Sequence, residues 1–124
     1  MKILFQGDSI TDADRNRDDI HDLGNGYPKY AAKYLTDYFP AIDFEFIDLG
    51  ISGNQTIDLV NRLESDFIDI QPDIVSILIG VNDVWHEVGG RCDGVPAEKF
   101  EKIYDMLLTE VLEACPDIKI MILG

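Results

Sequence analysis

The 124-residue sequence predicts an α/β domain of three layers, in which a parallel β-sheet lies between helices. Short apolar runs recur four times along the chain, and a glycine follows each of the first three. Helical stretches separate these runs, and the resulting order β-α-β-α-β-α-β requires crossover connections that make the sheet parallel. We expect the strand order 2-1-3-4, in which the first and third strands are neighbours.

The predicted strands cover residues 3–5, 44–49, 74–79 and 118–123. The third run is apolar on both faces, as a central parallel strand should be. We expect a polar loop over residues 11–25, rich in Asp and Arg, and a second loop over residues 85–95.

The predicted helices run from about residue 27 to 39, from Thr56 to the break at Pro72, and from Pro96 to about Cys115. In the first helix, the side chains that recur at helical spacing are Tyr30, Ala31, Tyr34, Leu35 and Tyr38. Thr56 is expected to cap the second helix. The expected buried stripe of the third is Phe100, Ile103, Leu107, Leu108, Val111 and Leu112.

Composition narrows the classes of partner. The formal net charge of −14 argues against nucleic acid and anionic membrane surfaces, because both attract clustered Lys and Arg. Cys92 and Cys115 are too few for a disulfide framework, and no Cys/His spacing resembles a zinc site. The sequence shows no secretory leader, lipidation motif or membrane-spanning apolar run, so we expect cytoplasmic residence.

Three residues suited to ester chemistry follow the first three predicted strands: Ser9, Gly53 and Asn82. Under the expected strand order their loops meet at one edge of the sheet, where ligands bind in open α/β folds. Ester cleavage needs a hydroxyl that attacks the acyl carbon and donors aimed at the resulting oxyanion. The backbone N–H groups of Ser9 and Gly53 and the side-chain amide of Asn82 are candidate donors. Serine is also a common helix N-cap, so Ser9 alone leaves both interpretations open.

The segments around these residues resemble a known family. Residues 7–10 read G-D-S-I, Gly53 follows the second strand, and residues 80–83 read G-V-N-D. They are similar, in order and placement, to blocks I, II and III of the SGNH (GDSL-type) hydrolases, which have a flavodoxin-like fold. That family includes esterases, lipases, thioesterases and carbohydrate deacetylases, and the resemblance covers nearly the whole chain.

The resemblance implies a serine hydrolase that cleaves small carboxylic esters, acetylated sugars among them, through an acyl-enzyme. It makes Ser9 the nucleophile, with Gly53 and Asn82 completing the oxyanion hole, and it implies no metal or cofactor. Asp8 and Asp83 are expected to support their turns by hydrogen bonding.

The sequence lacks the family's fourth signature, a late Asp-x-x-His block that supplies the catalytic base. Residues 83–86 spell D-x-x-H, but they lie in the oxyanion-hole segment, so we expect His86 to be a pocket or surface residue instead. Trp85 is a second candidate for the substrate pocket. His21 is expected to be a solvated loop residue. Because a serine hydroxyl is a poor nucleophile without a base, we expect little turnover from these residues alone.

The final strand, from Ile118 to Leu123, is apolar and nothing follows it to cover its edge. We therefore expect residues 1–124 to form one domain that is incomplete at its C-terminus. We also expect the exposed strand to pair with another chain, in a homo-oligomer or a swapped dimer.

Two other functions stay open. One is a non-catalytic binding or assembly module that keeps a hydrolase framework. The other is mononucleotide binding, which the sequence disfavours because the loop after the first strand contains only Gly7 and no glycine-rich phosphate cradle.

Overall fold

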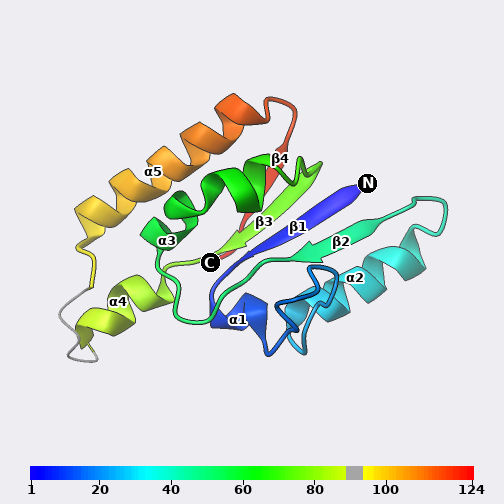
Figure 1. The fold of residues 1–124 in the computed structure, drawn as a ribbon, viewed down its shortest axis with the longest axis horizontal. Coiled ribbons are helices and arrows are strands. Elements are labelled where there is room, and N and C mark those ends of the chain that lie inside the picture. Colours follow the sequence, from blue (N-terminus) through cyan, green and yellow to red (C-terminus); the bar gives the residue numbers. More distant parts are fainter. Residues whose placement is uncertain (89–93) are drawn as a thin grey trace.

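The computed structural model of the protein describes residues 1–88 and 94–124. The elements, in chain order, are β1 (Lys2–Gly7), α1 (Ser9–Asp12), α2 (Tyr27–Tyr38), β2 (Glu45–Asp48), α3 (Thr56–Asn61), the π-helical turn η1 (Glu64–Ile68), β3 (Ile74–Leu78), α4 (Val81–Val88), α5 (Ala97–Ala114) and β4 (Lys119–Ile122) (Figure 1). Among the described helices, none combines the length and apolar character needed to cross a bilayer.

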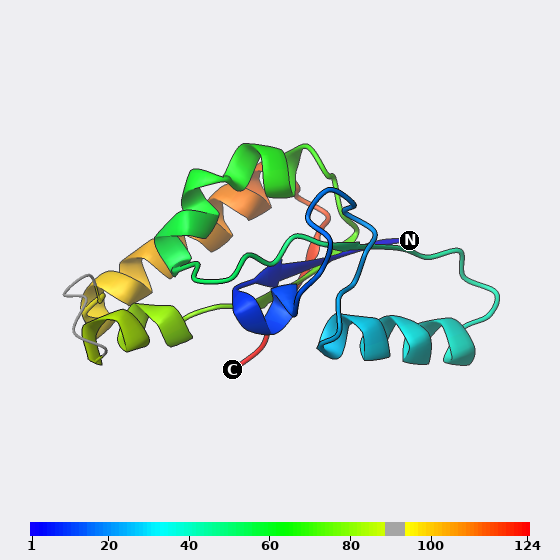
Figure 2. The same ribbon diagram turned by 60° about the horizontal axis from the view of Figure 1, so that its bottom comes forward.

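All four strands are parallel and lie in the order β2-β1-β3-β4, as the sequence predicts. Leu4 at the centre of β1 pairs with Ile47 of β2 on one side and with Val75 of β3 on the other. Helices α3 and α5 cover one face of the sheet and α2 lies on the other (Figure 2). The three-layer architecture is therefore confirmed.

The main hydrophobic core lies between the sheet and the helices α3 and α5. Strands and helices contribute buried side chains that pack against each other, among them Leu4, Ile47, Val75, Ile77, Leu59, Phe67, Leu107 and Val111. Burying each large apolar side chain stabilises the fold by about 1.5–3 kcal/mol. This core fixes the directions in which the strands deliver their C-terminal loops.

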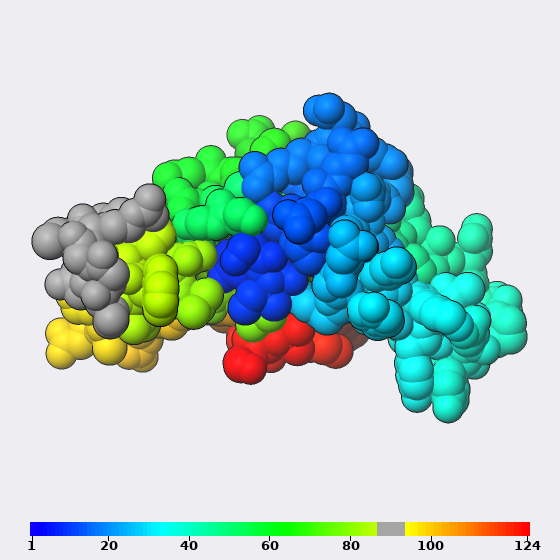
Figure 3. Space-filling model, turned by 90° about the horizontal axis from the view of Figure 1, so that it is seen from below, coloured from blue at the N-terminus to red at the C-terminus, as the bar shows by residue number. Residues whose placement is uncertain are grey.

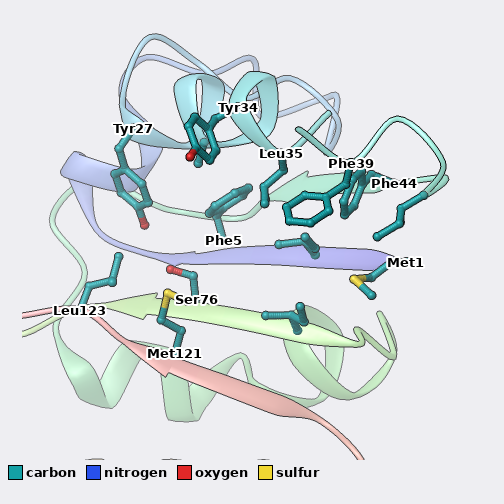
Figure 4. A pocket seen from close by; sticks show the side chains of 14 residues that line it. Met1, Phe5, Tyr27, Tyr34, Leu35, Phe39, Phe44, Ser76, Met121 and Leu123 are labelled. Carbon is teal, nitrogen blue, oxygen red and sulfur yellow. The ribbon is translucent and has the colours of Figure 1, made fainter. Parts of the chain in front are cut away.

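The opposite face of the sheet carries an apolar groove of about 500 Å³ beside α2 (Figure 4). The residues that line it include Phe5, Tyr34, Leu35, Ser76, Met121 and Leu123. The helix predicted from tyrosine spacing is confirmed as α2, but Tyr30, Tyr34 and Tyr38 are all exposed, and Pro28 and Ala32 are its buried residues. The spacing of the tyrosines therefore predicts the helix correctly, but it does not identify the side of the helix that is buried.

The predicted loop over residues 85–95 is wrong at its start, because residues 85–88 belong to α4. Two polar side chains of this helix face inward: Asp83 is 1% exposed and His86 7%. Two of its apolar side chains face outward, with Val84 62% and Trp85 64% exposed. This inversion hides the helix from a search for a buried apolar stripe. Residues 89–93 of the predicted loop, including Cys92, lie outside the described residues.

Two details of the other helices also differ from prediction. Gln55, not Thr56, is the N-cap of α3, where it forms a capping box with Asp58. The helix is not continuous to Pro72, because α3 ends and η1 follows. On α5, Leu112 is exposed although it belongs to the predicted buried stripe.

Candidate active site

The first turn of the site lies where β1 ends and α1 begins. Asp8 caps α1 by accepting the N–H of Ile10 at 3.0 Å, so the interpretation of Ser9 as the N-cap is wrong. Gly7 makes the close approach of β1 to β3 possible, because a Cβ there would lie 2.3 Å from the carbonyl oxygen of Leu78. Ser9 is the first residue of α1 and is exposed. Its hydroxyl is thus open to a substrate while the backbone behind it is held.

The second turn follows β2 and carries Gly53. The N–H of Ile51 donates to the Gly7 carbonyl at 3.1 Å. Ser52 donates its N–H and its hydroxyl to Oδ2 of Asp12 at 2.9 and 3.0 Å, which ties this loop to α1. Gly53 has a φ of +87°, a conformation that favours glycine, and no atom lies within 4 Å of where its Cβ would be. Backbone conformation, not crowding, therefore requires glycine here.

The third turn connects β3 to α4 and is tied to the second. The side-chain amide of Asn82 donates to the Asn54 carbonyl at 3.0 Å, and an amide nitrogen carries a second N–H that this bond does not use. Oδ2 of Asp83 accepts both the N–H and the hydroxyl of Thr56 at 3.1 Å. The two loops therefore hold each other in place.

These hydrogen bonds join three loops that are far apart in the sequence. The segments after β1, β2 and β3 lie side by side in blue, green and yellow-green on the face that Figure 3 turns to the viewer, which is the lower edge of the molecule in Figure 1. The structure thus brings Ser9, Gly53 and Asn82 to one edge of the sheet. Acyl transfer needs a hydroxyl and N–H donors that converge on one oxyanion, and these residues are the candidates for those roles.

Two buried carboxyl groups, those of Asp8 and Asp83, lie at this edge of the sheet. Burial raises the pKa of Asp8, and repulsion from Asp83 raises it further. Burial also raises the pKa of Asp83, while the two hydrogen bonds from Thr56 oppose the rise. Asp83 binds Thr56 of the neighbouring loop, whereas Asp8 accepts the N–H of Ile10 in its own turn, and both residues are buried.

Two buried ionisable residues, Asp48 and Arg15, hold the start of the loop that contains Gly53. The sequence analysis does not predict this role. Asp48 accepts the N–H of Gly50 at 3.0 Å, and Nε of Arg15 donates to the Gly50 carbonyl at 2.9 Å. Burial raises the pKa of Asp48 to about 7. The available signal was an aspartate between two apolar residues at the end of the predicted strand, two residues before Gly50.

The remaining candidates fall in different places. Trp85 faces outward on α4, one turn from Asn82, whereas His86 faces the interior. His21 is exposed, and its Nε2 lies 3.1 Å from a carboxylate oxygen of Glu45 at the start of β2. That is the end of the sheet opposite Ser9. Among the described residues, no group of three or more His, Cys, Asp or Glu side chains could hold a metal ion.

Comparison with known proteins identifies the family of this chain. The sequence profile of the GDSL-like Lipase/Acylhydrolase family matches residues 5–124. The chain belongs to this family. An acetylxylan esterase from Geobacillus stearothermophilus is 39% identical over an alignment 131 residues long. The alignment covers 98% of this chain and 58% of the esterase. The family resemblance inferred from the three sequence blocks is therefore confirmed.

Solved structures of the GDSL-like family share the fold. A GDSL-like lipase from Parabacteroides merdae has a TM-score of 0.92 and 38% identity, covering 98% of this chain and 57% of its own. The Geobacillus acetylxylan esterase has a TM-score of 0.87 and 36% identity over the same shares. Structures of that esterase include catalytic mutants in which a serine, an aspartate or a histidine is replaced by alanine. The chain spans just over half the length of these relatives.

Proposed function

We propose that this GDSL-family chain supplies the nucleophile and the oxyanion hole of a serine hydrolase for small carboxylic esters, in particular acetyl esters of carbohydrates. The proposal depends above all on the hydrogen-bonded convergence of the loops that carry Ser9, Gly53 and Asn82. The relationship to an acetylxylan esterase supports the carbohydrate ester class.

In this mechanism Oγ of Ser9 attacks the acyl carbon as a base takes the hydroxyl proton. The carbonyl electrons move to oxygen, and the N–H groups of Ser9, Gly53 and Asn82 stabilise that negative charge. The tetrahedral intermediate then expels the alcohol, which takes the proton from the base and leaves an acyl-enzyme. Water attacks the acyl-enzyme by the same route, which releases the carboxylic acid and restores Ser9.

We propose that the base comes from a separate Asp-x-x-His segment and that residues 1–124, as one incomplete domain, turn over esters weakly. The catalytic mutants of the Geobacillus relative support this, because they change an aspartate and a histidine as well as a serine. The position of His86 on the inward side of α4 also supports it, since a base must reach the exposed Ser9 hydroxyl.

Hydrolysis of 4-nitrophenyl acetate and of acetylated xylo-oligosaccharides tests the proposal. The two proteins are the chain of residues 1–124 and the product of its complete gene, each with a Ser9→Ala control. We expect hydrolysis that depends on Ser9 from the complete product and a rate close to the control from residues 1–124. Rapid turnover by residues 1–124 that is lost in His86→Ala would make His86 the base. Binding of the oligosaccharides without turnover by either protein would favour a binding module.

We also propose that residues 1–124, studied alone, associate through the final strand from Ile118 to Leu123, by pairing or strand exchange with another chain. Met121 and Ile122 are each 55% exposed, and Met121 lines the apolar groove. Light scattering during gel filtration measures the mass, and a monodisperse monomer would contradict this part. Cytoplasmic residence stays a prediction, which cell fractionation tests.

A further inference from the structure

Arg62 joins the strand ends behind the proposed active site. It follows the last residue of α3, and its side chain is only 14% exposed. Its guanidinium donates to the carbonyl oxygens of Leu49 at 2.8 Å and of Gly7 at 3.3 Å. Its Nε donates to Oδ1 of Asn54 at 3.0 Å. One side chain therefore holds the end of β1 and both ends of the loop that contains Gly53.

Each acceptor is close in the chain to one of the proposed oxyanion donors. Gly7 lies two residues before Ser9, and Asn54 directly follows Gly53. The backbone carbonyl of Asn54 also accepts the side-chain amide of Asn82 at 3.0 Å. A shift of the Arg62 side chain would therefore move groups that are only one or two residues, or one hydrogen bond, away from each of the three donors.

The chemistry of these contacts requires arginine. A planar guanidinium carries five N–H donors in a fixed geometry, so it can serve acceptors from several segments at once, whereas a lysine ammonium is a flexible point charge. Oδ2 of Asp66 lies 2.8 Å from Nη1 of Arg62 and balances the charge. The Asp66 carbonyl, in η1, accepts the side-chain amide of the fully buried Gln6 at 2.8 Å. The Arg62–Asp66 pair is thus connected to β1 from two directions.

We propose that Arg62 is a positioning residue for ester hydrolysis, which fixes the relative placement of the Ser9, Gly53 and Asn82 donors. The inference rests on the proposed function. Arg62 acts through other groups, because its four hydrogen bonds all go to protein atoms. Displaced donors weaken the stabilisation of the oxyanion more than they weaken substrate binding, so loss of Arg62 should lower kcat and leave KM nearly unchanged.

Arg62→Lys in the product of the complete gene measures this effect with 4-nitrophenyl acetate. Loss of one oxyanion donor typically costs about 10²–10³ in rate, so we expect kcat to fall by about 10- to 100-fold. We expect KM to stay within about threefold. The matched control is Lys33→Ala, which breaks the Lys33–Asp37 pair, also at spacing i,i+4 and at 2.8 Å but exposed on α2. The control should retain wild-type kcat, and an equal kcat for Arg62→Lys would overturn the proposal.

Asn54→Ala provides a second variant in case Arg62→Lys does not fold. It removes one acceptor of the Arg62 guanidinium but keeps the backbone carbonyl that binds Asn82. We expect a smaller fall in kcat, of about 3- to 10-fold, again with KM nearly unchanged. Unchanged kcat in Asn54→Ala would overturn the proposal. In the double variant the two effects should be less than additive, because both remove the same contact.

Nuclear magnetic resonance on residues 1–124 gives a measurement that does not depend on hydrolysis. Arg62→Lys should shift the backbone amide signal of Gly53 and the side-chain amide signals of Asn82, and it should speed hydrogen exchange at the latter. Lys33→Ala should leave all of them unchanged. Unchanged signals in Arg62→Lys would overturn the positioning role. If the complete gene product shows no hydrolysis that depends on Ser9, the proposed function fails, and this spectrum still decides whether Arg62 positions the three groups.

Discussion

The carboxyl group of Asp48 should make the stability of this protein depend on pH, and Asp48→Asn isolates that contribution. The side chain is fully buried at the end of β2, where it accepts the Gly50 N–H at 3.0 Å and lies 3.8 Å from Nε of Arg15. Burial raises its pKa from 3.8 to about 7, against the opposing effects of Gly50 and Arg15. The folded protein therefore binds this proton more tightly than the unfolded chain does.

The direction of the effect follows from this difference in proton binding. The stabilising contribution of protonated Asp48 is fully present below pH 3.8 and is lost as the pH rises to about 7. A difference of about 3 pKa units at about 1.36 kcal/mol each gives a loss of about 4 kcal/mol. Asparagine keeps an oxygen that can accept the Gly50 N–H but does not ionise, so the variant should escape this loss.

Urea unfolding of both proteins across about pH 4 to pH 8.5 provides the assay. The free energy of unfolding of Asp48→Asn minus that of the wild type should rise steadily up to about pH 7 and then level off. Any difference in stability between the asparagine variant and the protein with neutral Asp48 is independent of pH, so it shifts the whole curve but not its slope. The attraction of the ionised carboxylate to Arg15 is already part of the pKa of about 7. A difference that stays constant over the range would refute the argument, because the other carboxyl groups titrate in both proteins.

Four further substitutions test the turns and the core by thermal or urea unfolding. Gly53→Ala should cost only about 1–2 kcal/mol, since its φ of +87° is unfavourable but the space around it is open. Gly7→Ala should cost about 3 kcal/mol or more, because the new Cβ would lie 2.3 Å from a backbone carbonyl oxygen, and the reverse ranking would contradict this. Thr56→Val should cost about 1–2 kcal/mol at pH 8 through the lost hydroxyl bond to Asp83, whereas a neutral effect would show that this bond contributes nothing. Leu107→Ala, in the fully buried face of α5, should cost about 2–5 kcal/mol, and a cost below about 1 kcal/mol would mean that the core closes around the cavity.

The parts of the fold that could be predicted from the sequence are those encoded by local patterns. An apolar run that ends in glycine, such as β1 with Gly7, specifies both a buried strand and the sharp turn after it. Once the strand order was set, the loops carrying Ser9, Gly53 and Asn82 had to meet, because parallel strands end at the same edge. The convergence therefore followed from topology before any side-chain contact was known.

The missed features depend on contacts between residues that are distant in the sequence. Arg62 binds carbonyl groups 13 and 55 residues away, and no local pattern encodes such partners. Thr56 resembles an N-cap in the sequence, but its hydroxyl bonds to Asp83 from the next loop, so the capping position shifts to Gln55. The sequence predicts a loop at Trp85 because the pattern of its helix is inverted, with Asp83 and His86 buried and Trp85 exposed.

In the inverted helix α4, buried polar side chains hold the helix in place and exposed apolar side chains form its outer surface. Its inward residues, Asp83 and His86, belong to the scaffold, whereas Val84 and Trp85 face outward beside the edge that carries Asn82. Natural variation on the outward side can therefore reshape the surroundings of the oxyanion hole without disturbing the core. A family built this way can diversify in what it accepts while the framework beneath remains the same.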